Sequence, residues 1–503
     1  MPTVIPIDTP TLGDRSYLAH DGRVALVVDP QRDIDRVLAV AGEAGVRITH
    51  VFETHIHNDY VTGGFALAAV TGAAYHVNAE DPVAFERVPV RDGDVVGIGE
   101  RMRLRVLATP GHTFTHLSYA LEHLAHGEWT TVGVFTGGSL LHGAVGRPDL
   151  LGPEHTRALA RHQHASAQRL AALPEQARVL PTHGFGSFCA ATQSTAEAST
   201  IGTEKAANQA LTADADTFIA DLLAGLDAWP AYYARMAPAN SAGPAASDLG
   251  LPPRADAAGI RAALAAGEWV VDLRNRVAFA AGHVAGTVNM GLDGSFATYL
   301  GWIVPAGAAL TVLAETPEEV LRARRELSRI GVDPEAHAAG PIRALAGGAP
   351  LSGYPRAGFA ELAQVRHHRP VVVLDVRRDL EHAGGHLPGA LHIPLHELRD
   401  RLGEVPEGEV WVHCAAGYRA SIAASMLAAA GRRVVHVDDD FAAAAALDAF
   451  GWAPSSAEPA EPAERAEPAE PVEPAETAVS ASAAAAVSAV SAGSPAGTPE
   501  AMA

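Results

Sequence analysis

The sequence predicts an α/β protein with a layered N-terminal domain, two smaller α/β domains and a tail without a fold of its own. Strand-like runs rich in β-branched residues alternate with helix-like segments in the first part of the chain. A segment around Asp272 then recurs around Asp375, and each aspartate is followed eleven positions later by a histidine, His283 or His386. These two observations set the fold class and the order of the domains.

The first elements of the N-terminal domain follow from local spacing. Residues 34–44 carry apolar side chains at helical intervals, and Gly45 is a natural helix stop. Residues 46–52 are rich in β-branched side chains and predict a strand that is at least half buried, and a second helical stretch covers residues 65–70. Strand and helix therefore alternate, as expected for stacked layers of sheet and helix.

The loop after this strand carries a dense polar motif, Thr54-His55-Ile56-His57-Asn58-Asp59-Tyr60. In an extended backbone alternate residues lie on one side, so His55 and His57 point the same way. Two imidazoles and a carboxylate within five residues are a suitable set for holding a metal ion. A single histidine is usually an ordinary surface or core residue, but this spacing favours a metal site over that interpretation.

Three later motifs repeat the pattern of an apolar run followed by a turn with a polar residue. They are Thr109-Pro-Gly-His112-Thr, then Phe135-Thr-Gly-Gly138-Ser-Leu with the following Gly146-Arg147-Pro-Asp149, and Pro181-Thr-His183-Gly. The Pro-Gly turn is sharp and can hold the His112 imidazole against a preformed site. The sequence thus predicts a site assembled from several strand-end loops.

Composition argues against several function classes. The formal charge of −21 over 503 residues argues against nucleic acid or an anionic membrane as a partner, although part of it lies in the tail. There are only two cysteines, Cys189 and Cys414, so we expect no disulfide framework and a reducing compartment. No secretion signal and no apolar run of membrane-spanning length is apparent. We therefore expect a soluble, cytoplasmic protein.

Composition also sets the expected boundaries. The first domain should cover residues 1–236 with a helical C-terminal extension, and a linker rich in Pro, Gly, Ala and Ser should cover 237–256. The two copies of the repeat should cover 257–350 and 358–453. Residues 455–503 consist of Glu-Pro-Ala repeats and Ala/Ser-rich sequence, which lack the large apolar residues of a core, so we expect a disordered tail.

Together, the histidine motifs and the Phe-Thr-Gly run resemble the metallo-β-lactamase fold, an αββα sandwich, over about residues 1–235. Within that fold the sequence is most similar to the persulfide dioxygenases, which are relatives of glyoxalase II. The Gly146-Arg147-x-Asp149 motif and the attached repeat support this resemblance. It implies a metal centre at the strand ends, and His55 and His112 match two ligands of the single iron of the dioxygenases.

Two positions depart from the family pattern. The hydrolases have a histidine where this chain has Tyr60, and hydrolases and dioxygenases alike have an aspartate where this chain has Gly138. In the dinuclear hydrolases both residues serve the second metal, so their loss argues for a single ion. The loss also removes the third ligand of the dioxygenases.

We therefore expect one Fe(II) per chain, held by the three imidazoles of His55, His57 and His112. This set would leave three open positions on an octahedral iron for a thiolate and O2. Asp59, Asp149 or water could complete the set instead, and His183 is counted with Asp59 among the metal-site residues. Zinc is the alternative to iron, and a degenerate site without any metal stays open as well.

The resemblance places the loop of Arg147 and Asp149 near the substrate. Arg147 could clamp the carboxylates of the thiol, but an internal salt bridge with Asp149 is an equal alternative. We assign Tyr60 to substrate binding together with these two residues. Cys189 is expected to pack as a small apolar group. The histidines outside the motifs are expected to be surface or core residues: His76, His116, His142, His162 and His164.

The second copy of the repeat contains His413-Cys414-Ala-Ala-Gly417-Tyr-Arg419 between an apolar strand and a helix. A cysteine at a helix N-terminus meets unpaired N–H groups and a favourable dipole, which stabilise its thiolate. Arg419 adds positive charge, and Gly417 allows a tight turn. This loop, with Gly385-His-Leu-Pro-Gly389, resembles the rhodanese active site. Four residues separate Cys414 from Arg419, which fits sulfur carried as a persulfide better than the wider phosphate loop of related phosphatases.

The first copy has Ala314 where the second has Cys414. It cannot carry sulfur and is expected to be a structural partner or docking surface.

These expectations describe a bifunctional enzyme of sulfide oxidation. The N-terminal domain would oxidise a thiol persulfide, such as glutathione persulfide, with O2, and Cys414 would accept or donate sulfane sulfur, with sulfite or thiosulfate as further partners. One alternative is a zinc thioester hydrolase of the glyoxalase II type joined to a sulfurtransferase. Another is a catalytically silent N-terminal domain that scaffolds the rhodanese. Whether the chain forms a homo-oligomer is open.

Overall fold

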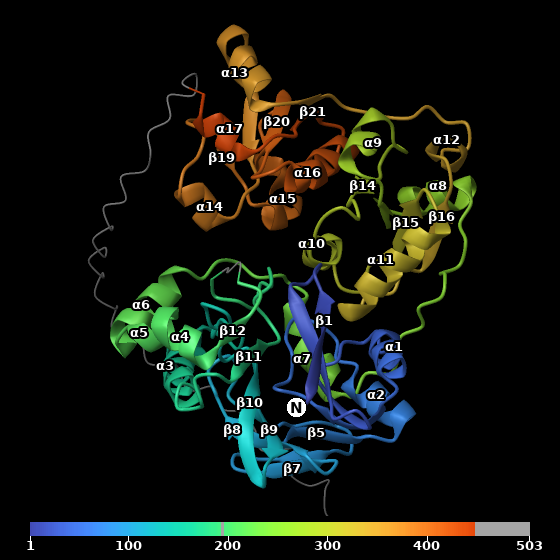
Figure 1. Ribbon diagram of the computed structural model, residues 1–503. Helices are drawn as coiled ribbons and strands as arrows, with labels where there is room; N and C mark the ends of the chain where they lie inside the picture. Colours follow the sequence, from blue (N-terminus) through green and yellow to red (C-terminus); the bar gives the residue numbers. More distant parts are fainter. Residues whose placement is uncertain (193–195, 448–503) are drawn as a thin grey trace, which may run out of the picture. The chain divides into compact units, whose positions relative to one another are not determined.

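The computed structural model describes residues 1–192 and 196–447. The expected tail over 455–503 and the last residues of the second repeat domain lie outside the described residues. Within them, two six-stranded sheets come from the first 200 residues, and a four-stranded and a five-stranded sheet follow (Figure 1).

The first sheet has the strand order β1-β2-β3-β4-β5-β6. Its first three strands pair antiparallel, and β3 to β6 pair parallel. The strands and the two helices of this region are β1 (Thr3–Thr9), β2 (Asp14–His20), β3 (Val24–Val28), α1 (Asp35–Ala44), β4 (Arg47–Phe52), α2 (Gly64–Thr71), β5 (Ala74–Asn78) and β6 (Val88–Val90).

The second sheet has the order β12-β11-β10-β9-β8-β7 and is antiparallel except for the pair of β10 and β11. Its strands and helices are β7 (Val95–Ile98), β8 (Met102–Ala108), β9 (Leu117–Ala125), β10 (Glu128–Gly137), α3 (Pro153–Leu170), β11 (Arg178–Pro181), β12 (Ser199–Thr200), α4 (Ile201–Ala207), α5 (Gln209–Thr212), α6 (Ala215–Ala224) and α7 (Tyr233–Ser241).

Successive side chains of a strand point to opposite faces of its sheet, so the two sheets contribute to three buried clusters: one between the sheets and one on the outer face of each. Tyr17 and Phe52 of the first sheet pack with Tyr119 and Phe135 of the second in one buried cluster between the sheets. The opposite face of the first sheet packs on α1 and α2, and that of the second packs on α3 and the helices that follow β12. The order of layers is helix, sheet, sheet, helix, so the predicted αββα sandwich is confirmed.

The predicted helix over 34–44 and strand over 46–52 are confirmed as α1 and β4. Gly45 ends α1 in the left-handed region with φ 65°, and its N–H bonds to the carbonyls of Ala41 and Gly42. Strands β4, β8, β10 and β11 end at or within two residues of the polar motifs, and Gly137 of β10 lies opposite Pro181 of β11. The ends of neighbouring strands thereby bring the motif loops together.

The expected linker differs from the structure at its start. Helix α7 continues to Ser241, five residues into the range 237–256, even though it contains Pro238. The reason is the buried Asn240, whose side chain accepts from the N–H of Thr62 at 2.9 Å and donates to the carbonyls of His57 and Tyr60, both at 2.9 Å. This segment is therefore tied to the histidine loop.

The two copies of the repeat form all-parallel sheets of the orders β14-β13-β15-β16 and β17-β21-β20-β18-β19. The elements of the first copy are α8 (Ala257–Ala265), β13 (Trp269–Asp272), α9 (Arg276–Ala281), β14 (Val288–Asn289), α10 (Phe296–Ile303), β15 (Leu310–Ala314), α11 (Pro317–Arg329), β16 (Ala336–Ala339) and α12 (Ile342–Leu345). Those of the second are β17 (Arg356–Ala357), α13 (Phe359–His368), β18 (Val372–Asp375), α14 (Asp379–Ala383), β19 (Leu391–His392), α15 (Leu395–Arg401), η1 (Leu402–Glu404), β20 (Glu409–His413), α16 (Tyr418–Ala429), β21 (Arg433–Val437) and α17 (Phe441–Ala445).

The strand registers of the two copies correspond. Asp272 lies opposite Leu313 in the first copy, and Asp375 lies opposite His413 in the second. The next residues are Ala314 and Cys414, which supports their predicted correspondence. In the described part of the chain, every helix is too short or too polar to span a lipid bilayer.

Candidate functional site

Four imidazoles from three loops gather at the strand ends of the sandwich. The ring of His55 lies 4.1 Å from that of His57, 4.8 Å from that of His112 and 5.4 Å from that of His183, measured between centroids. All four residues are at most 1% exposed. The sequence-predicted histidines therefore meet in one buried cluster.

In His55 and His112 the protein fixes which ring nitrogen carries the proton. The Nδ1 of His112 lies 2.8 Å from the carbonyl oxygen of Arg147, which can only accept, so Nδ1 donates and Nε2 keeps a lone pair. Thr54 Oγ1 donates to Asp29 at 2.8 Å and therefore accepts from Nδ1 of His55 at 2.9 Å. The Nε2 atom of each ring is thus left without a proton and can accept a ligand.

The other two imidazoles are held by carboxylates on one nitrogen. Nδ1 of His183 lies 2.9 Å from Asp14, which leaves its Nε2 facing Nε2 of His55 at 3.4 Å. Nε2 of His57 lies 3.2 Å from Asp29 and 3.3 Å from Glu53, which leaves Nδ1 on the other side. Outer carboxylates and carbonyls on the second ring nitrogen are typical of histidines that ligate metals.

Several of the convergent atoms are buried without a hydrogen-bond partner. They include Nδ1 of His57, Nε2 of His112 and both carboxylate oxygens of Asp59. Unpaired buried polar atoms are costly, and a cation bound beside any of them would reduce that cost. The residues present therefore fit a metal ion.

The distances group these ligands differently from the expected trio. Ligand atoms of His55, His57 and His183 lie within 4.8 Å of one another, and so do those of Asp14, Asp59 and His183. Among the described residues, the set His55, His57 and His112 does not reach that spacing. Which three side chains hold an ion stays a prediction; His183 belongs to the groups of His55 with His57, of Asp14 with Asp59 and of His112 with Cys189.

The position of the His112 ring depends on the absence of a side chain at Gly138. A Cβ built on Gly138 would lie 2.4 Å from Cδ2 of His112, far below van der Waals contact. The imidazole therefore occupies the space that a side chain at residue 138 would need. The backbone N–H of Gly138 also donates to Nε2 of His116 at 3.0 Å.

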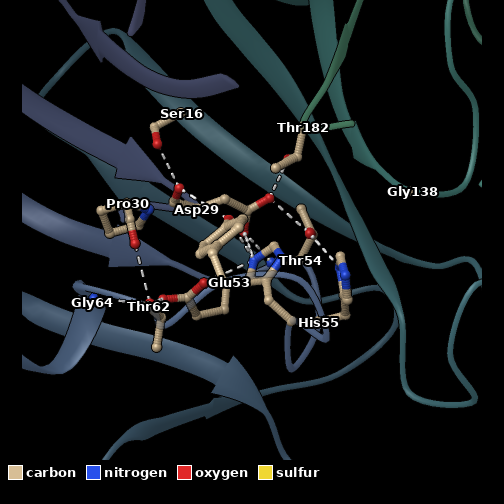
Figure 2. A network of polar contacts seen from close by, with 12 residues as sticks. Ser16, Asp29, Pro30, Glu53, Thr54, His55, Thr62, Gly64, Gly138 and Thr182 are labelled. Atoms are coloured by element: carbon tan, nitrogen blue, oxygen red, sulfur yellow. Dashed lines mark hydrogen bonds and ion pairs between the residues drawn. The ribbon is translucent and has the colours of Figure 1, made fainter. Parts of the chain in front are cut away.

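Asp29 is the centre of a polar network that includes Thr54 and Thr182, as Figure 2 shows. Its carboxylate accepts from the N–H and hydroxyl of Thr54 and from the hydroxyl of Thr182. Its backbone has a left-handed φ of 53°, which is uncommon for a residue with a side chain. Oε1 of Glu53 accepts from the hydroxyls of both Thr62 and Tyr75, whereas Oε2 faces His57.

The carboxylates control the charge of the cluster. Burial lowers the pKa of His57, but Asp29 and Glu53 raise it to about 9. Burial likewise lowers the pKa of His183, and Asp59 and Asp14 raise it to about 10. Burial and the charge of His183 lower the pKa of His112 to about 3. The cluster thus combines a neutral His112 with carboxylates that attract positive charge.

Tyr60 does not lie where a substrate-binding residue is expected. It is fully buried, and its hydroxyl lies 3.0 Å from Nε2 of His57 and donates to the carbonyl of Asp29 at 3.3 Å. The Tyr60 hydroxyl therefore contacts Nε2 of the His57 ring and leaves Nδ1 uncovered. This position argues against direct substrate contact, and the assignment of Tyr60 to substrate binding stays a prediction.

Arg147 and Asp149 form the internal salt bridge that was one of two expectations. Nε and Nη2 of Arg147 each lie 2.7 Å from an oxygen of Asp149, and Nη2 also donates to the carbonyl of Asp227 at 2.6 Å. Arg147 is 4% exposed. The pair occupies both carboxylate oxygens, which argues against Asp149 as a metal ligand and against Arg147 as a free anion clamp.

Several supporting residues were not singled out from the sequence: Asp14, Asp29, Glu53, Thr54, Thr182 and Asn240. Asp29 and Asp14 stand at strand ends far from the histidine motifs in sequence, so no local spacing identifies them. Glu53 directly precedes the motif and could have been noticed as a carboxylate at the end of a buried strand. Only the fold shows that these side chains face the imidazoles.

Cys189 and His116 are buried, as expected, but closer to the cluster than expected. The sulfur of Cys189 belongs to a group with His112 and His183 whose ligand atoms lie within 4.8 Å. Burial raises the pKa of this thiol well above its usual range. The ring of His116 stacks on that of His55 at 4.9 Å. Both residues pack against the site.

A second candidate site is the loop of Cys414, between β20 and α16. Cys414 is a free, buried cysteine, and Gly417 precedes the helix in the left-handed region with φ 85°. Both Nη atoms of Arg419 lie 2.5 and 2.6 Å from the oxygens of Glu381. Although burial raises the pKa of Glu381, this pairing lowers it to about 2. The arginine is therefore fixed beside the loop as half of an ion pair.

The corresponding loop of the first copy is closed. Only Glu315 and Thr316 separate β15 from α11, and their N–H groups both donate to the carboxylate of Glu319, at 2.8 and 3.2 Å. The N–H groups that would cradle an anion are thus occupied by the chain's own side chain, in addition to the missing cysteine at Ala314.

Comparison with known proteins gives two separate matches. The model of the rhodanese-like domain matches residues 359–446. A hydroxyacylglutathione hydrolase from Polaromonas sp. (strain JS666 / ATCC BAA-500) is 33% identical over 164 residues, which are 32% of this chain and 57% of the hydrolase. The chain spans 57% to 66% of the length of the hydrolases of this name that it matches.

Solved structures also resemble the chain. A metallo-beta-lactamase from Staphylococcus aureus subsp. aureus COL is 28% identical, with a TM-score of 0.61, and the match covers 68% of this chain and 99% of that one. ETHE1 from Myxococcus xanthus is 29% identical, with a TM-score of 0.41, over 48% of this chain and 98% of its own. The first likeness covers more of the chain than residues 1–236 alone, so it extends into the repeat.

Proposed function

Because this chain is a fusion of a metallo-β-lactamase-fold domain with rhodanese-like sequence, we propose that it oxidises a low-molecular-weight thiol persulfide to sulfite and carries sulfane sulfur on Cys414. The observation that carries the first half is the arrangement of the imidazoles. Each of His55, His57, His112 and His183 has one nitrogen held by a protein oxygen, which leaves the other nitrogen for a ligand. Such a set is built to hold a cation.

One ion per chain is the stoichiometry that the site favours. The position that would supply a bridging carboxylate is Gly138, and the His112 ring fills the space beside it. Tyr60 lies behind His57 and contacts Nε2, so it is turned away from the centre. With both second-metal positions altered, the residues fit a mononuclear site of imidazoles and Asp59.

An Fe(II) ion, when bound, would supply the redox chemistry for oxidation by O2. The chain's own groups do the rest: the outer oxygens of Asp29, Asp14 and the Arg147 carbonyl fix the rings, and the fully buried walls limit water at the centre. The proposed reaction converts RSSH, O2 and H2O into RSH, sulfite and two protons. The outer sulfur loses four electrons, which O2 takes up.

The second half of the proposal concerns Cys414. Its thiolate would attack the outer sulfur of thiosulfate or of a persulfide and form a Cys414 persulfide, while sulfite or the thiol leaves with the electron pair. The short loop before α16, the left-handed Gly417 and the match of the rhodanese-like model to this region support the assignment. With persulfide oxidation and sulfur transfer on one chain, a reactive persulfide could pass between the two sites without being released into solution.

A thioester hydrolase is the second candidate, and the likeness to hydroxyacylglutathione hydrolases favours it. Hydrolysis of this kind would use zinc. The substitution at Gly138 and the inward His112 argue against the dinuclear version of such a site. The two candidates differ in whether oxygen is consumed.

Oxygen uptake separates them. The chain loaded with iron is mixed with glutathione persulfide, and O2 consumption and sulfite are measured together; a parallel sample receives S-lactoylglutathione. We expect one sulfite for each O2 consumed and no thioester hydrolysis. Hydrolysis of the thioester without oxygen uptake would replace our proposal by the hydrolase.

A further inference from the structure

The first copy of the repeat forms part of the wall of the Cys414 loop. The hydroxyl of Tyr418, in that loop, donates to the carbonyl of Gly291 at 2.7 Å, and its ring lies 5.9 Å from that of Tyr299. Gly294 packs closely against the same ring. A Cβ added to Gly294 would lie only 2.4 Å from a ring carbon of Tyr418. The copy without a cysteine is therefore in direct contact with the loop that has one.

Arg276 is the cation that the first copy brings to this loop. Its Nε donates to Asp438 at 2.6 Å, and a Cβ built on Gly417 would lie 3.3 Å from that Nε. Gly417 stands only three positions after Cys414. Among residues 1–192 and 196–447, Nη2 of Arg276 makes no hydrogen bond or ion pair, so a donor remains for a ligand.

The loop's own arginine has less to offer an anion. Both Nη atoms of Arg419 are bound to Glu381 in a bidentate pair. Asp438, by contrast, is shared by two guanidinium groups, because Arg356 lies 2.8 Å from its other oxygen. Nη1 of Arg276 lies 3.3 Å from Asp293, so the two arginines face two carboxylates, and the donor left for an anion at this edge of the loop is Nη2 of Arg276.

We propose that Arg276 binds the anionic end of the sulfur donor at the Cys414 site, so that the copy without a cysteine completes the site of the copy that has one. The ligand class is a small sulfur oxyanion such as thiosulfate. As the Cys414 thiolate bonds to the outer sulfur, the sulfur–sulfur bond of thiosulfate breaks and sulfite leaves as a dianion with the electron pair. The inference rests on the proposed sulfurtransferase function.

Substitution Arg276→Gln in the full chain tests it, with thiosulfate as donor and cyanide as acceptor. We expect the KM for thiosulfate to rise about tenfold, with kcat changed by less than about threefold, since one charged contact is lost. Arg276→Lys should recover part of the loss. With diallyl trisulfide, a donor without charge, Arg276→Gln should behave like the wild type.

Arg356→Gln is the matched control, because it removes the other guanidinium from Asp438. An equal rise in KM in both variants would reduce Arg276 to a structural ion pair and overturn the inference, as would an unchanged KM in Arg276→Gln. Calorimetry of thiosulfate binding to the Cys414→Ser chain, with and without Arg276→Gln, tests the role of Arg276 separately from the proposed sulfurtransferase activity. If the wild type transfers no sulfur, weaker binding after Arg276→Gln still supports the site, and equal binding refutes it.

Discussion

The two candidate centres of this chain are built from different kinds of charged side chain. Buried carboxylates lie around the imidazoles of the N-terminal domain, namely Asp14, Asp29, Glu53 and Asp59. Arginines lie around the loop of Cys414, namely Arg276, Arg356 and Arg419. A cation bound at the first centre would attract an anionic persulfide, whereas the arginines of the second are each paired with an acidic residue and offer hydrogen-bond donors.

Because the two centres use different side chains, we expect a substitution at one centre to leave the activity of the other unchanged. A change that removes the cation at the first leaves the arginines of the second in place, and a change at the second leaves the imidazoles untouched. The predictions below test that separation, starting with the largest effect.

Cys414→Ser should reduce thiocyanate formation from thiosulfate and cyanide by at least about a thousandfold, because the nucleophile is lost. Persulfide-dependent oxygen uptake should stay within about twofold of the wild type. Cys189→Ser is the matched control for the transfer assay and should retain it. Parallel loss of both activities in Cys414→Ser would mean that the centres are coupled.

His112→Ala should lower persulfide-dependent oxygen uptake by about a hundredfold or more and lower the bound metal, because a free Nε2 at the centre is lost. Sulfur transfer should be unchanged. His155→Ala, at an exposed histidine outside the cluster, is the control. Full metal content and uptake in His112→Ala would remove this residue from the site.

Metal affinity should rise with pH at the first centre. Neighbouring carboxylates raise the pKa of His57 to about 9 and of His183 to about 10, so near pH 7 each ring carries a second proton that a metal must displace. Each released proton gives about a tenfold rise in affinity per pH unit below those values. Calorimetry between pH 6 and 8 would show it, and an affinity independent of pH would contradict the charge assigned to these rings.

Gly138→Ala should give the smallest change, about a fivefold loss of oxygen uptake, because the new Cβ would push the His112 ring away from its place. Sulfur transfer should not respond. Gly97→Ala is the matched control, since a Cβ there would meet no atom within 4 Å. Wild-type uptake in Gly138→Ala would show that the ring can move without cost.

Much of this fold could be predicted because its signals are local. Helix α1 with its stop at Gly45 and the β4 strand followed by the histidine motif both follow from spacing over a few residues. The cysteine loop was equally clear, since a strand, a glycine turn and a helix are adjacent in sequence. Corresponding strand registers then support the match of Ala314 to Cys414.

The rest of the site depends on contacts between distant segments. Asp14 reaches His183 from 169 positions away, and Asn240 reaches the His57 loop from 183 positions away. No spacing rule connects such pairs, so the linker was predicted to start too early. The neighbours of Tyr60 in sequence likewise do not reveal that its hydroxyl contacts Nε2 of His57.

The central claim is that the N-terminal domain holds a single redox metal. Elemental analysis of the freshly purified full chain, run beside His112→Ala, tests it most directly. We predict one iron per wild-type chain and a clear loss in the variant. Two zinc ions per chain, or no metal bound in stoichiometric amount, would contradict the account.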